Sequence, residues 1–307
     1  MKRFVKTAAA FCLVLAAVLI LADYPLSRSM RKVHTFGMDT WRDIFEGKAG
    51  ADILIQGDSR AFNACDQAVF DSLTGLTAYN LTTIGNPFLM QEFRYGMYRG
   101  HNRKPRVILQ FTDEFFLGTA ISDYDRVQYL PWMWDKSFTG GLLSVSRRLF
   151  LQNAFPVLRY HGYRPWALAR EPRMTRNGFY LPDYELFRDS VFHHPAEPER
   201  AFYYSGYMHD RLTRFLRDAA EEGIRVVLVS PPLHESLAFE EGGKEEMVRF
   251  FRSVADTCGV PFLDGTSMAI VHDSTCFLDR GHLNMNGARI FSDTLARYLN
   301  GLHLSDN

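Results

Sequence analysis

The stretch Ile53-Leu-Ile-Gln-Gly-Asp-Ser-Arg-Ala-Phe-Asn63 changes abruptly from apolar to polar residues. Its first four residues are typical of a buried strand, and the Gly-Asp-Ser that follows is typical of a turn. Two interpretations of this turn are open. In the first, the strand simply ends and a small polar residue caps the next helix. In the second, Ser59 is a nucleophile at the carboxyl end of a strand, where open α/β sheets bind their ligands.

The composition is that of a folded globular protein. The chain has 307 residues, of which 47% are hydrophobic and 23% are charged. This length suits one large α/β domain or two small ones. The 35 basic and 35 acidic side chains give a net charge of zero. Because binding to phosphates needs a basic surface, we expect no nucleic acid among the partners.

The N-terminus has the pattern of a secretory signal or a signal anchor. Lys2, Arg3 and Lys6 precede an uncharged apolar run over residues 7–22. Ile20 spoils the small-x-small cleavage pattern near Ala22, so we expect an uncleaved membrane anchor over residues 1–23, with cleavage as the alternative. The basic end then stays inside, and the rest of the chain lies outside the cytoplasm. Residues 24–50 are expected to form a stalk that leads into a short helix.

Short apolar runs between helical stretches predict an α/β fold with a parallel sheet of about five strands, covered by helices on both faces. The expected strands are 52–56, 78–81, 106–111, 225–230 and 260–264. The carboxyl ends of parallel strands meet at one edge of the sheet. We therefore expect Ser59, the pair Gly85-Asn86 and Asp113, which follow three of these strands, to lie near that edge.

Residues 115–203 depart from this alternating pattern. The segment holds Trp132, Trp134 and Trp166 and shows no clean period. It is too long for a simple connection between a strand and a helix. We expect an aromatic-rich insertion with a helix at 142–152, placed within a domain that spans 51–307. Its tryptophans either stack on sugar rings or pack in a core.

Cysteines and histidines give no sign of a cofactor. The four cysteines are Cys12, Cys65, Cys258 and Cys276, and pairing of the last two is open in an oxidising compartment. No Cys-x-x-Cys or His-x-x-x-His spacing is present. We expect no metal ion and no other cofactor.

A second polar motif, Phe277-Leu-Asp-Arg-Gly-His-Leu-Asn284, precedes the last expected helix. Asp279 and His282 are three residues apart, so a tight turn brings both side chains to one side. A serine hydroxyl is a weak nucleophile that needs a base, usually histidine, and an acid that orients the base. Ser59, His282 and Asp279 are therefore our candidate catalytic residues, provided that Ser59 Oγ and His282 Nε2 lie within hydrogen-bond distance.

Together the two motifs resemble those of the SGNH, or GDSL-like, hydrolase superfamily, in its membrane-anchored extracytoplasmic subset. The resemblance covers about 51–111 and 205–299 and leaves out the insertion. It implies a flavodoxin-like three-layer α/β/α fold and activity on esters. Ser59 would be the nucleophile, His282 the general base and acid, and Asp279 the orienting carboxylate. The backbone N–H groups of Ser59 and Gly85 would bind the oxyanion.

The third sequence block departs from the family pattern. The family has an asparagine there, whereas this chain reads Gln110-Phe-Thr-Asp-Glu114. An ionised Asp113 accepts hydrogen bonds and would oppose an oxyanion. Either Asn86 supplies the missing donor, or the oxyanion site is weaker, or Asp113 has another role.

Three further residues are weaker candidates for binding substrate. They are Arg60, Asp113 and His234. Arg60 either pairs with Asp66 or Asp113 or holds an anionic substrate. His234 follows Pro231-Pro232 at the end of a strand, where it either lines the cleft or takes no part.

Three functions are consistent with these motifs. The first is a serine esterase that acts on O-acyl esters, such as acetyl esters, of a cell-surface glycan. The second is an O-acyltransferase that modifies a surface polysaccharide with the same three residues. The third is a non-catalytic envelope protein that binds a glycan or a protein partner. The missing asparagine favours the second and third, and the intact triad favours the first two.

Overall fold

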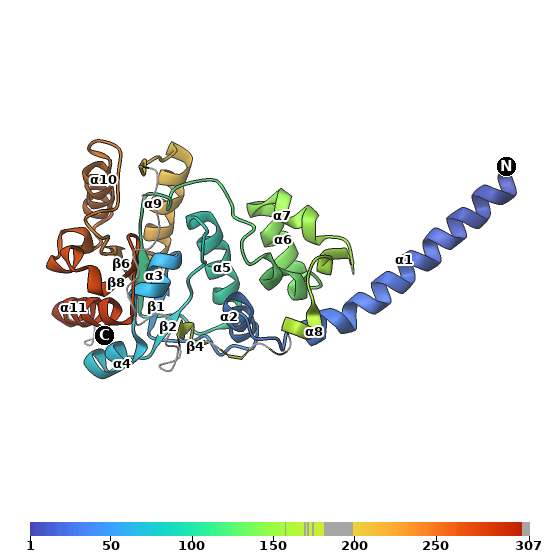
Figure 1. Cartoon of the computed structure of the whole chain (residues 1–307), viewed down its shortest axis with the longest axis horizontal. Coiled ribbons are helices and arrows are strands. Elements are labelled where there is room, and N and C mark those ends of the chain that lie inside the picture. The colour runs from blue at the N-terminus through green and yellow to red at the C-terminus, as the bar shows by residue number, and fades with distance from the viewer. Residues whose placement is uncertain (157, 169, 171, 174, 181–198, 303–307) are drawn as a thin grey trace. The chain divides into compact units, whose positions relative to one another are not determined.

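A computed structural model describes the chain except for residues 157, 169, 171, 174, 181–198 and 303–307 and the side chains of Phe36, Pro165 and Trp166. The described residues form two compact units (Figure 1). One comprises Met1–Asp43 with Asp123–Met174, and the other comprises Ile44–Ser122 with Thr175–Asn307. We call them the helical unit and the sheet unit.

The sheet unit contains a five-stranded parallel sheet in the order β2-β1-β3-β6-β7. Its strands are β1 (Ile53–Gln56), β2 (Ala78–Asn80), β3 (Val107–Phe111), β6 (Arg225–Ser230) and β7 (Phe262–Asp264). All four pairings are parallel. The α/β class and the five parallel strands predicted from the sequence are thus confirmed. Strand β7 begins after Pro261, because proline has no N–H to donate to a neighbouring strand.

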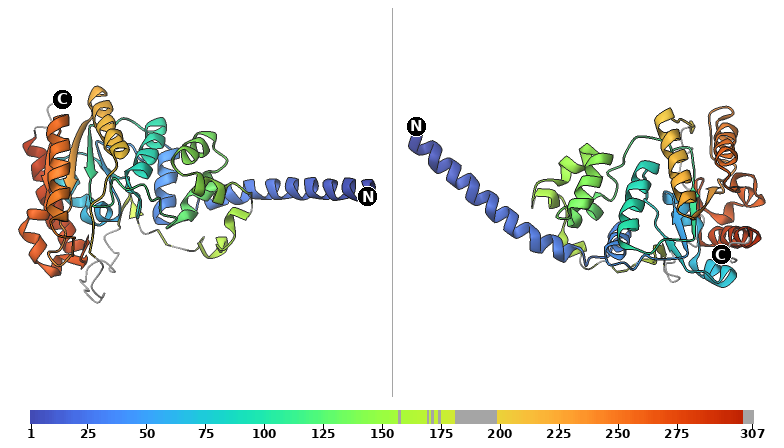
Figure 2. Two further views of the ribbon diagram at one scale, coloured as in Figure 1. Left: turned by 90° about the horizontal axis from the view of Figure 1, so that it is seen from above. Right: turned by 180° about the vertical axis from the view of Figure 1, so that it is seen from behind.

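The long helices of this unit also follow the predicted pattern. They are α5 (Phe88–His101), α9 (Gly206–Glu221), α10 (Gly243–Cys258) and α11 (Met285–Gly301), and the shorter α3 (Ser59–Ala64) and α4 (Gln67–Thr74) follow β1. Helices α4 and α11 pack on one face of the sheet, where Phe70, Phe291 and Leu295 meet Ile55 and Leu109 in one core cluster. Figure 2 shows α11 running along the strands on that side.

Short elements complete the sheet unit. They are the antiparallel hairpin β4 (Thr175–Arg176) with β5 (Phe179–Tyr180), the hairpin β8 (Phe277–Asp279) with β9 (His282–Leu283), and the 3-10 turns η4 (Gly265–Ser267), η5 (Ala269–His272) and η6 (Ser274–Cys276). Asn284 caps α11, since its Oδ1 accepts from the N–H groups of Asn286 and Gly287.

The helical unit is built on α1 (Lys2–Met30) and α2 (Phe36–Phe45), whose last two residues count with the sheet unit. It adds η1 (Arg126–Trp132), α6 (Lys136–Val145), α7 (Arg147–Asn153), η2 (Leu158–Tyr160) and α8 (Pro165–Leu168). The helix expected at 142–152 is thus two helices. The chain breaks at Ser146, whose side chain caps α7 by accepting from Leu149 N–H.

Within the described residues, α1 is the one helix that is long and apolar enough to cross a membrane. It continues past residue 23, where the anchor was expected to end. Asp23 is buried; it accepts a hydrogen bond from Trp134 Nε1 (2.6 Å) and pairs with Arg159 (3.4 Å). Ser27 Oγ lies 2.8 Å from the Tyr160 hydroxyl. The end of α1 is therefore part of the helical unit and not a free stalk.

The structure divides the expected insertion at 115–203 between the two units. Residues 123–174 join the N-terminal helices, whereas the β4–β5 hairpin joins the sheet unit. Trp132 is buried in the helical unit and lies under the Arg31 guanidinium, so it serves packing. Trp134 holds Asp23, and the Trp166 side chain lies outside the described residues. All four cysteines are free, so the pairing of Cys258 with Cys276 is not formed.

Candidate active site

The turn after β1 presents Ser59 at the start of α3. Gly57 has a φ of +157°, and a Cβ there would lie 2.4 Å from Ala61 Cβ and 2.8 Å from Phe111 Cβ, so only glycine fits. Asp58 caps α3 by accepting from Arg60 N–H at 2.9 Å. The turn is thus a helix cap and also the place where Ser59 is displayed. The two interpretations of the sequence are compatible.

Ser59 belongs to a hydrogen-bonded chain of three side chains. Ser59 Oγ lies 2.8 Å from His282 Nε2, and His282 Nδ1 lies 2.9 Å from both carboxylate oxygens of Asp279. If Nδ1 carries the proton towards the carboxylate, Nε2 is left to accept the serine proton. The β8–β9 hairpin makes this possible, because its tight turn sets Asp279 opposite His282.

Asp279 is held as an anion. Burial alone would raise the pKa of this carboxyl. The hydrogen bond and charge of His282 and the backbone N–H groups of Gly281 (2.8 Å) and His282 (2.9 Å) outweigh burial and lower the pKa below its ordinary value. The side chains of His282 and Asp279 are 27% and 29% exposed, so the triad is open to solvent.

Arg60 lies behind the triad, paired with Glu114 rather than with Asp66 or Asp113. Both guanidinium Nη atoms bond to the Glu114 carboxylate in the buried interior. Burial opposes the charge of Arg60, but Glu114 outweighs it and raises the pKa of the guanidinium, while Arg60 lowers the pKa of Glu114 against the effect of burial. Arg60 is 5% exposed, which leaves it no access to an anionic substrate.

This ion pair supports the turn between Asp279 and His282. A Cβ added at Gly281 would lie 3.4 Å from Arg60 Nε, so the guanidinium and the turn are in close contact. Asp66, the other expected partner, pairs with Arg289 at 3.3 Å. We assign Arg60 a positioning role behind the hairpin that carries His282.

Asp113 is linked to the residue before the nucleophile. It is 5% exposed, accepts from Phe115 N–H at 2.7 Å and shares a hydrogen bond with Asp58. Burial, and then the charge of Asp58, raise the pKa of Asp113 well above its ordinary value. The raised pKa favours the protonated form of Asp113, which can donate to Asp58. A protonated carboxyl would oppose an oxyanion less than a carboxylate does.

The loop of Gly85 and Asn86 is attached to the same turn. Thr83 N–H donates to the Gly57 carbonyl at 2.8 Å. Gly85 has a φ of +69°. Asn86 is buried and holds its own loop, because its Nδ2 donates to Ile84 O (3.1 Å) and its Oδ1 accepts from Ser122 N–H (3.2 Å). These bonds leave Asn86 less free to serve as an oxyanion donor than the Gly85 backbone.

Two side chains of helix α5 stabilise this loop. Gln91 Nε2 donates to the Asn86 carbonyl at 3.2 Å, and the buried Arg94 donates to the Thr82 carbonyl. The loop is therefore held in one conformation by side chains of a long helix.

His234 lies beside the triad hairpin. The backbone N–H of His234 donates to the Arg280 carbonyl (3.0 Å), and the ring Nδ1 lies 2.7 Å from Ser236 Oγ. Its ring packs on Phe277, with centroids 5.3 Å apart. Burial lowers the pKa of His234, so this imidazole stays neutral at neutral pH. These contacts give His234 a part in holding the hairpin.

Sequence reasoning missed two residues at this site. One is Glu114, whose partner lies 54 positions away and leaves no local signal. The other is Asn63, whose Nδ2 donates to the Ser59 carbonyl at 3.0 Å and which the i, i+4 spacing on α3 places beside Ser59.

Within the parts of the chain that the structure describes, no group of three His, Cys, Asp or Glu residues is arranged to hold a metal ion. Comparison of the chain with protein-family models and with curated protein sequences found no match to either.

Proposed function

We propose that this protein is a membrane-anchored serine esterase of the SGNH type that removes O-acyl groups, such as acetyl, from a cell-surface glycan. The observation that carries the proposal is the unbroken chain from Ser59 Oγ through His282 to Asp279. The parallel sheet, with Ser59 just after β1 and His282 just before α11, is consistent with a flavodoxin-like three-layer fold.

The reaction follows from the geometry in two halves. Ser59 Oγ attacks the ester carbonyl while His282 Nε2 takes its proton, and Asp279 stabilises the imidazolium that forms. His282 then gives the proton to the leaving sugar oxygen, and an acyl-Ser59 remains. Water attacks this ester with His282 again as base, and the acid and free Ser59 are released.

The oxyanion needs hydrogen-bond donors beside Ser59. We assign this role to the backbone N–H groups of Ser59 and Gly85. The hydrogen bond between Thr83 and Gly57 joins the two loops that carry them. The raised pKa of Asp113 favours its protonated form, which would oppose this negative charge less than a carboxylate does.

In this proposal, the N-terminal helix determines where in the cell the protein is located. Helix α1 anchors the chain in a membrane, with Lys2, Arg3 and Lys6 on the cytoplasmic side and the chain after the apolar run outside the cytoplasm. A fusion of alkaline phosphatase to the C-terminus tests this topology. The proposal expects high phosphatase activity, because that enzyme folds outside the cytoplasm. An inactive fusion would indicate the opposite orientation.

An O-acyltransferase is the second candidate, because a sugar hydroxyl can replace water in the second half of the reaction. It is favoured by a cavity of about 660 Å³ lined by Asn63 and Leu283, next to the triad, which has room for an acceptor. A purely binding role has less support, because Ser59 and His282 are within hydrogen-bond distance.

One assay tests the esterase and separates it from the transferase. The full-length protein in mild detergent is given p-nitrophenyl acetate, with and without an oligosaccharide acceptor, and nitrophenol, acetate and acetylated sugar are measured. An esterase releases equal amounts of nitrophenol and acetate, whereas a transferase yields acetylated sugar. Loss of turnover in Ser59→Ala is expected in both cases. Equal turnover in Ser59→Ala and wild type would contradict both.

A further inference from the structure

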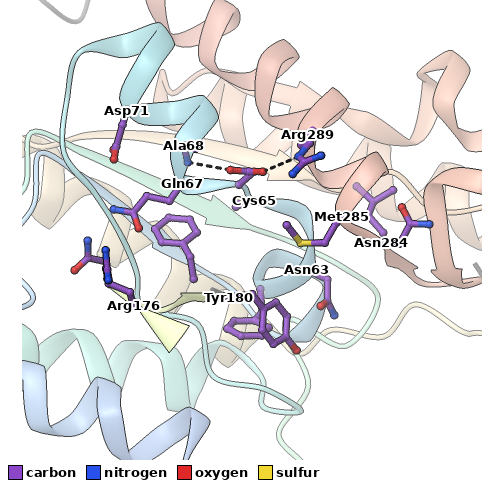
Figure 3. Close-up of a pocket in the computed structure, with 15 residues that line it drawn as sticks. Asn63, Cys65, Gln67, Ala68, Asp71, Arg176, Tyr180, Asn284, Met285 and Arg289 are labelled. Carbon is purple, nitrogen blue, oxygen red and sulfur yellow. Dashed lines mark hydrogen bonds and ion pairs between the residues drawn. The ribbon is translucent and has the colours of Figure 1, made fainter. Parts of the chain in front are cut away.

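A second feature of the sheet unit is a cavity of about 660 Å³, whose wall includes Leu283, the residue after His282 (Figure 3). Its walls come from α3, α4, the β4–β5 hairpin and the first turns of α11. In Figure 3, Asn63 and Met285 lie at one end, whereas Arg176, Gln67 and Asp71 gather at the other. Arg289 lies on the same side as Met285, so charged side chains line both sides of the cavity.

The wall of the cavity includes neighbours of the triad residues in the sequence. Asn63 lies one turn after Ser59 on α3 and donates to its carbonyl at 3.0 Å. This bond uses Asn63 Nδ2 and leaves its Oδ1 with no partner among the described residues. Leu283, also in the wall, directly follows His282. None of the three triad residues is part of the cavity wall, but two of its lining residues are thus close neighbours of Ser59 and His282 along the chain.

The β4–β5 hairpin is a fixed wall of the cavity. Asn80 N–H, at the end of β2, donates to the Asn177 carbonyl at 2.8 Å. Gly178 lies so close to β2 that an added Cβ would be 1.8 Å from the Asn80 carbonyl oxygen. Phe179 is buried in the core cluster of the sheet. The backbone that carries Arg176 and Tyr180, on either side of this turn, is therefore held in place before any ligand binds.

The lining offers both donors and acceptors next to an aromatic ring. Gln67 hydrogen-bonds to Asp71, and the Arg176 side chain forms no hydrogen bond or ion pair with any described residue. Tyr180 packs edge-on against Phe62, with ring centroids 4.4 Å apart. Sugar hydroxyls donate and accept at once, and sugar C–H faces pack on aromatic rings, so this set suits a carbohydrate.

The volume of the cavity also favours a sugar. An acetyl group has three heavy atoms and needs on the order of 100 Å³, taking about 30 Å³ for each from the share of one water molecule in the liquid. The cavity is several times larger and falls in the range that holds small molecules, about 300 to 1,000 Å³. It is thus too large to be a pocket for the acyl group alone.

We propose that this cavity binds the sugar part of the substrate next to the ester bond, with Tyr180 as the stacking platform and Arg176 and Asn63 as the hydrogen-bonding residues. The inference rests on the proposed function, because it assigns the cavity to the substrate of the esterase. Sugar binding is nevertheless measured independently of ester turnover. The other occupant of a cavity this size beside Ser59 is a long acyl chain.

The test is ligand-observed saturation-transfer NMR on the full-length protein in nanodiscs, with empty nanodiscs subtracted. The probes are an N-acetylglucosamine tetramer, a galacturonate tetramer and hexanoate. The variants are Tyr180→Ala, Arg176→Ala and Tyr180→Phe. The controls are Tyr203→Ala, exposed in the loop before α9, and Arg249→Ala, exposed on α10. Tyr180→Phe retains the ring and guards against a folding defect.

The proposal expects at least one tetramer to bind wild type, both control variants and Tyr180→Phe. Tyr180→Ala and Arg176→Ala should bind it at least fivefold more weakly. Binding of the acidic tetramer alone, lost in Arg176→Ala, would specify an acidic sugar. Binding of hexanoate alone, binding of no probe, or equal binding by all variants would overturn the proposal.

The chemistry is scored separately, so that the two failures are distinguishable. If p-nitrophenyl acetate is not turned over but the tetramer binds as expected, the esterase fails and the sugar site stands. If the acetate is turned over and no tetramer binds, the site fails and the esterase stands. Where both hold, the loss in Tyr180→Ala should be at least tenfold larger for an acetylated sugar than for p-nitrophenyl acetate.

Discussion

Replacing Asp113 with asparagine tests the protonation state at the base of the active site. Asp113 is buried and shares a hydrogen bond with Asp58, and its pKa is raised well above 3.8. At pH values between about 4 and this raised pKa, the folded chain holds a proton that the unfolded chain has released. Raising the pH from there therefore favours the unfolded chain. Asparagine has nearly the same shape, donates the same hydrogen bond and cannot ionise.

The size of the effect follows from proton linkage. While the folded protein retains one proton that the unfolded chain has lost, its free energy of unfolding falls by about 1.4 kcal/mol per pH unit. Asp113→Asn should thus gain about 1.4 kcal/mol relative to wild type for each pH unit between the unfolded pKa and the raised folded pKa, and this is the gain to measure. It stops growing above the pKa of Asp113 in the folded protein.

The assay is hydrogen exchange of β3 (Val107–Phe111), measured by mass spectrometry at several pH values and corrected for the intrinsic exchange rate. Tryptophan fluorescence is unsuitable, because all four tryptophans lie in the helical unit. Asp256→Asn, an exposed change on α10, is the control and should track wild type. A constant penalty in Asp113→Asn at every pH would refute the reasoning and mean that Asp113 is ionised when folded.

Three further changes have expected outcomes. Asp279→Asn should lower kcat for p-nitrophenyl acetate by roughly 10³- to 10⁴-fold without changing the melting temperature, and a loss below tenfold would contradict its orienting role. Arg60→Met leaves the buried Glu114 with the more distant Arg200 guanidinium (4.0 Å) as ion-pair partner, so it should cost up to about 3 to 5 kcal/mol in urea unfolding. Adding Glu114→Leu to Arg60→Met should restore most of the lost free energy of unfolding. If the two substitutions instead destabilise the protein additively, the pairing of Arg60 with Glu114 is contradicted. Gly57→Ala should abolish activity and increase protease cleavage near residue 57, and a native-like, active variant would contradict the steric argument.

The sheet was predictable because buried parallel strands are continuous apolar runs and helices show a period of 3.6 residues. Strand β6 matches its expected bounds of 225–230. The juxtaposition of Ser59 with His282 was predictable for a different reason. One residue follows the first strand and the other precedes the last helix, and the topology of a parallel sheet brings both to one edge.

Pairings between distant residues were not predictable from local pattern. The sequence offers Arg60 several acidic residues as possible partners, and only the packed structure shows that it pairs with Glu114. The protonation of Asp113 depends on its burial against Asp58, which no spacing reveals. The helical unit shows the same limit, because Asp23 is paired with Trp134 and Arg159, more than 100 positions away.

The most direct test of the central claim is labelling of the full-length protein in mild detergent with a fluorophosphonate, followed by mass mapping of the adduct. Wild type, Ser59→Ala, His282→Ala and the exposed control Ser253→Ala are run side by side. The account predicts one adduct on Ser59 that is unchanged in Ser253→Ala, absent in Ser59→Ala and at least a hundredfold slower to form in His282→Ala. A folded wild type that forms no adduct on Ser59 would contradict it.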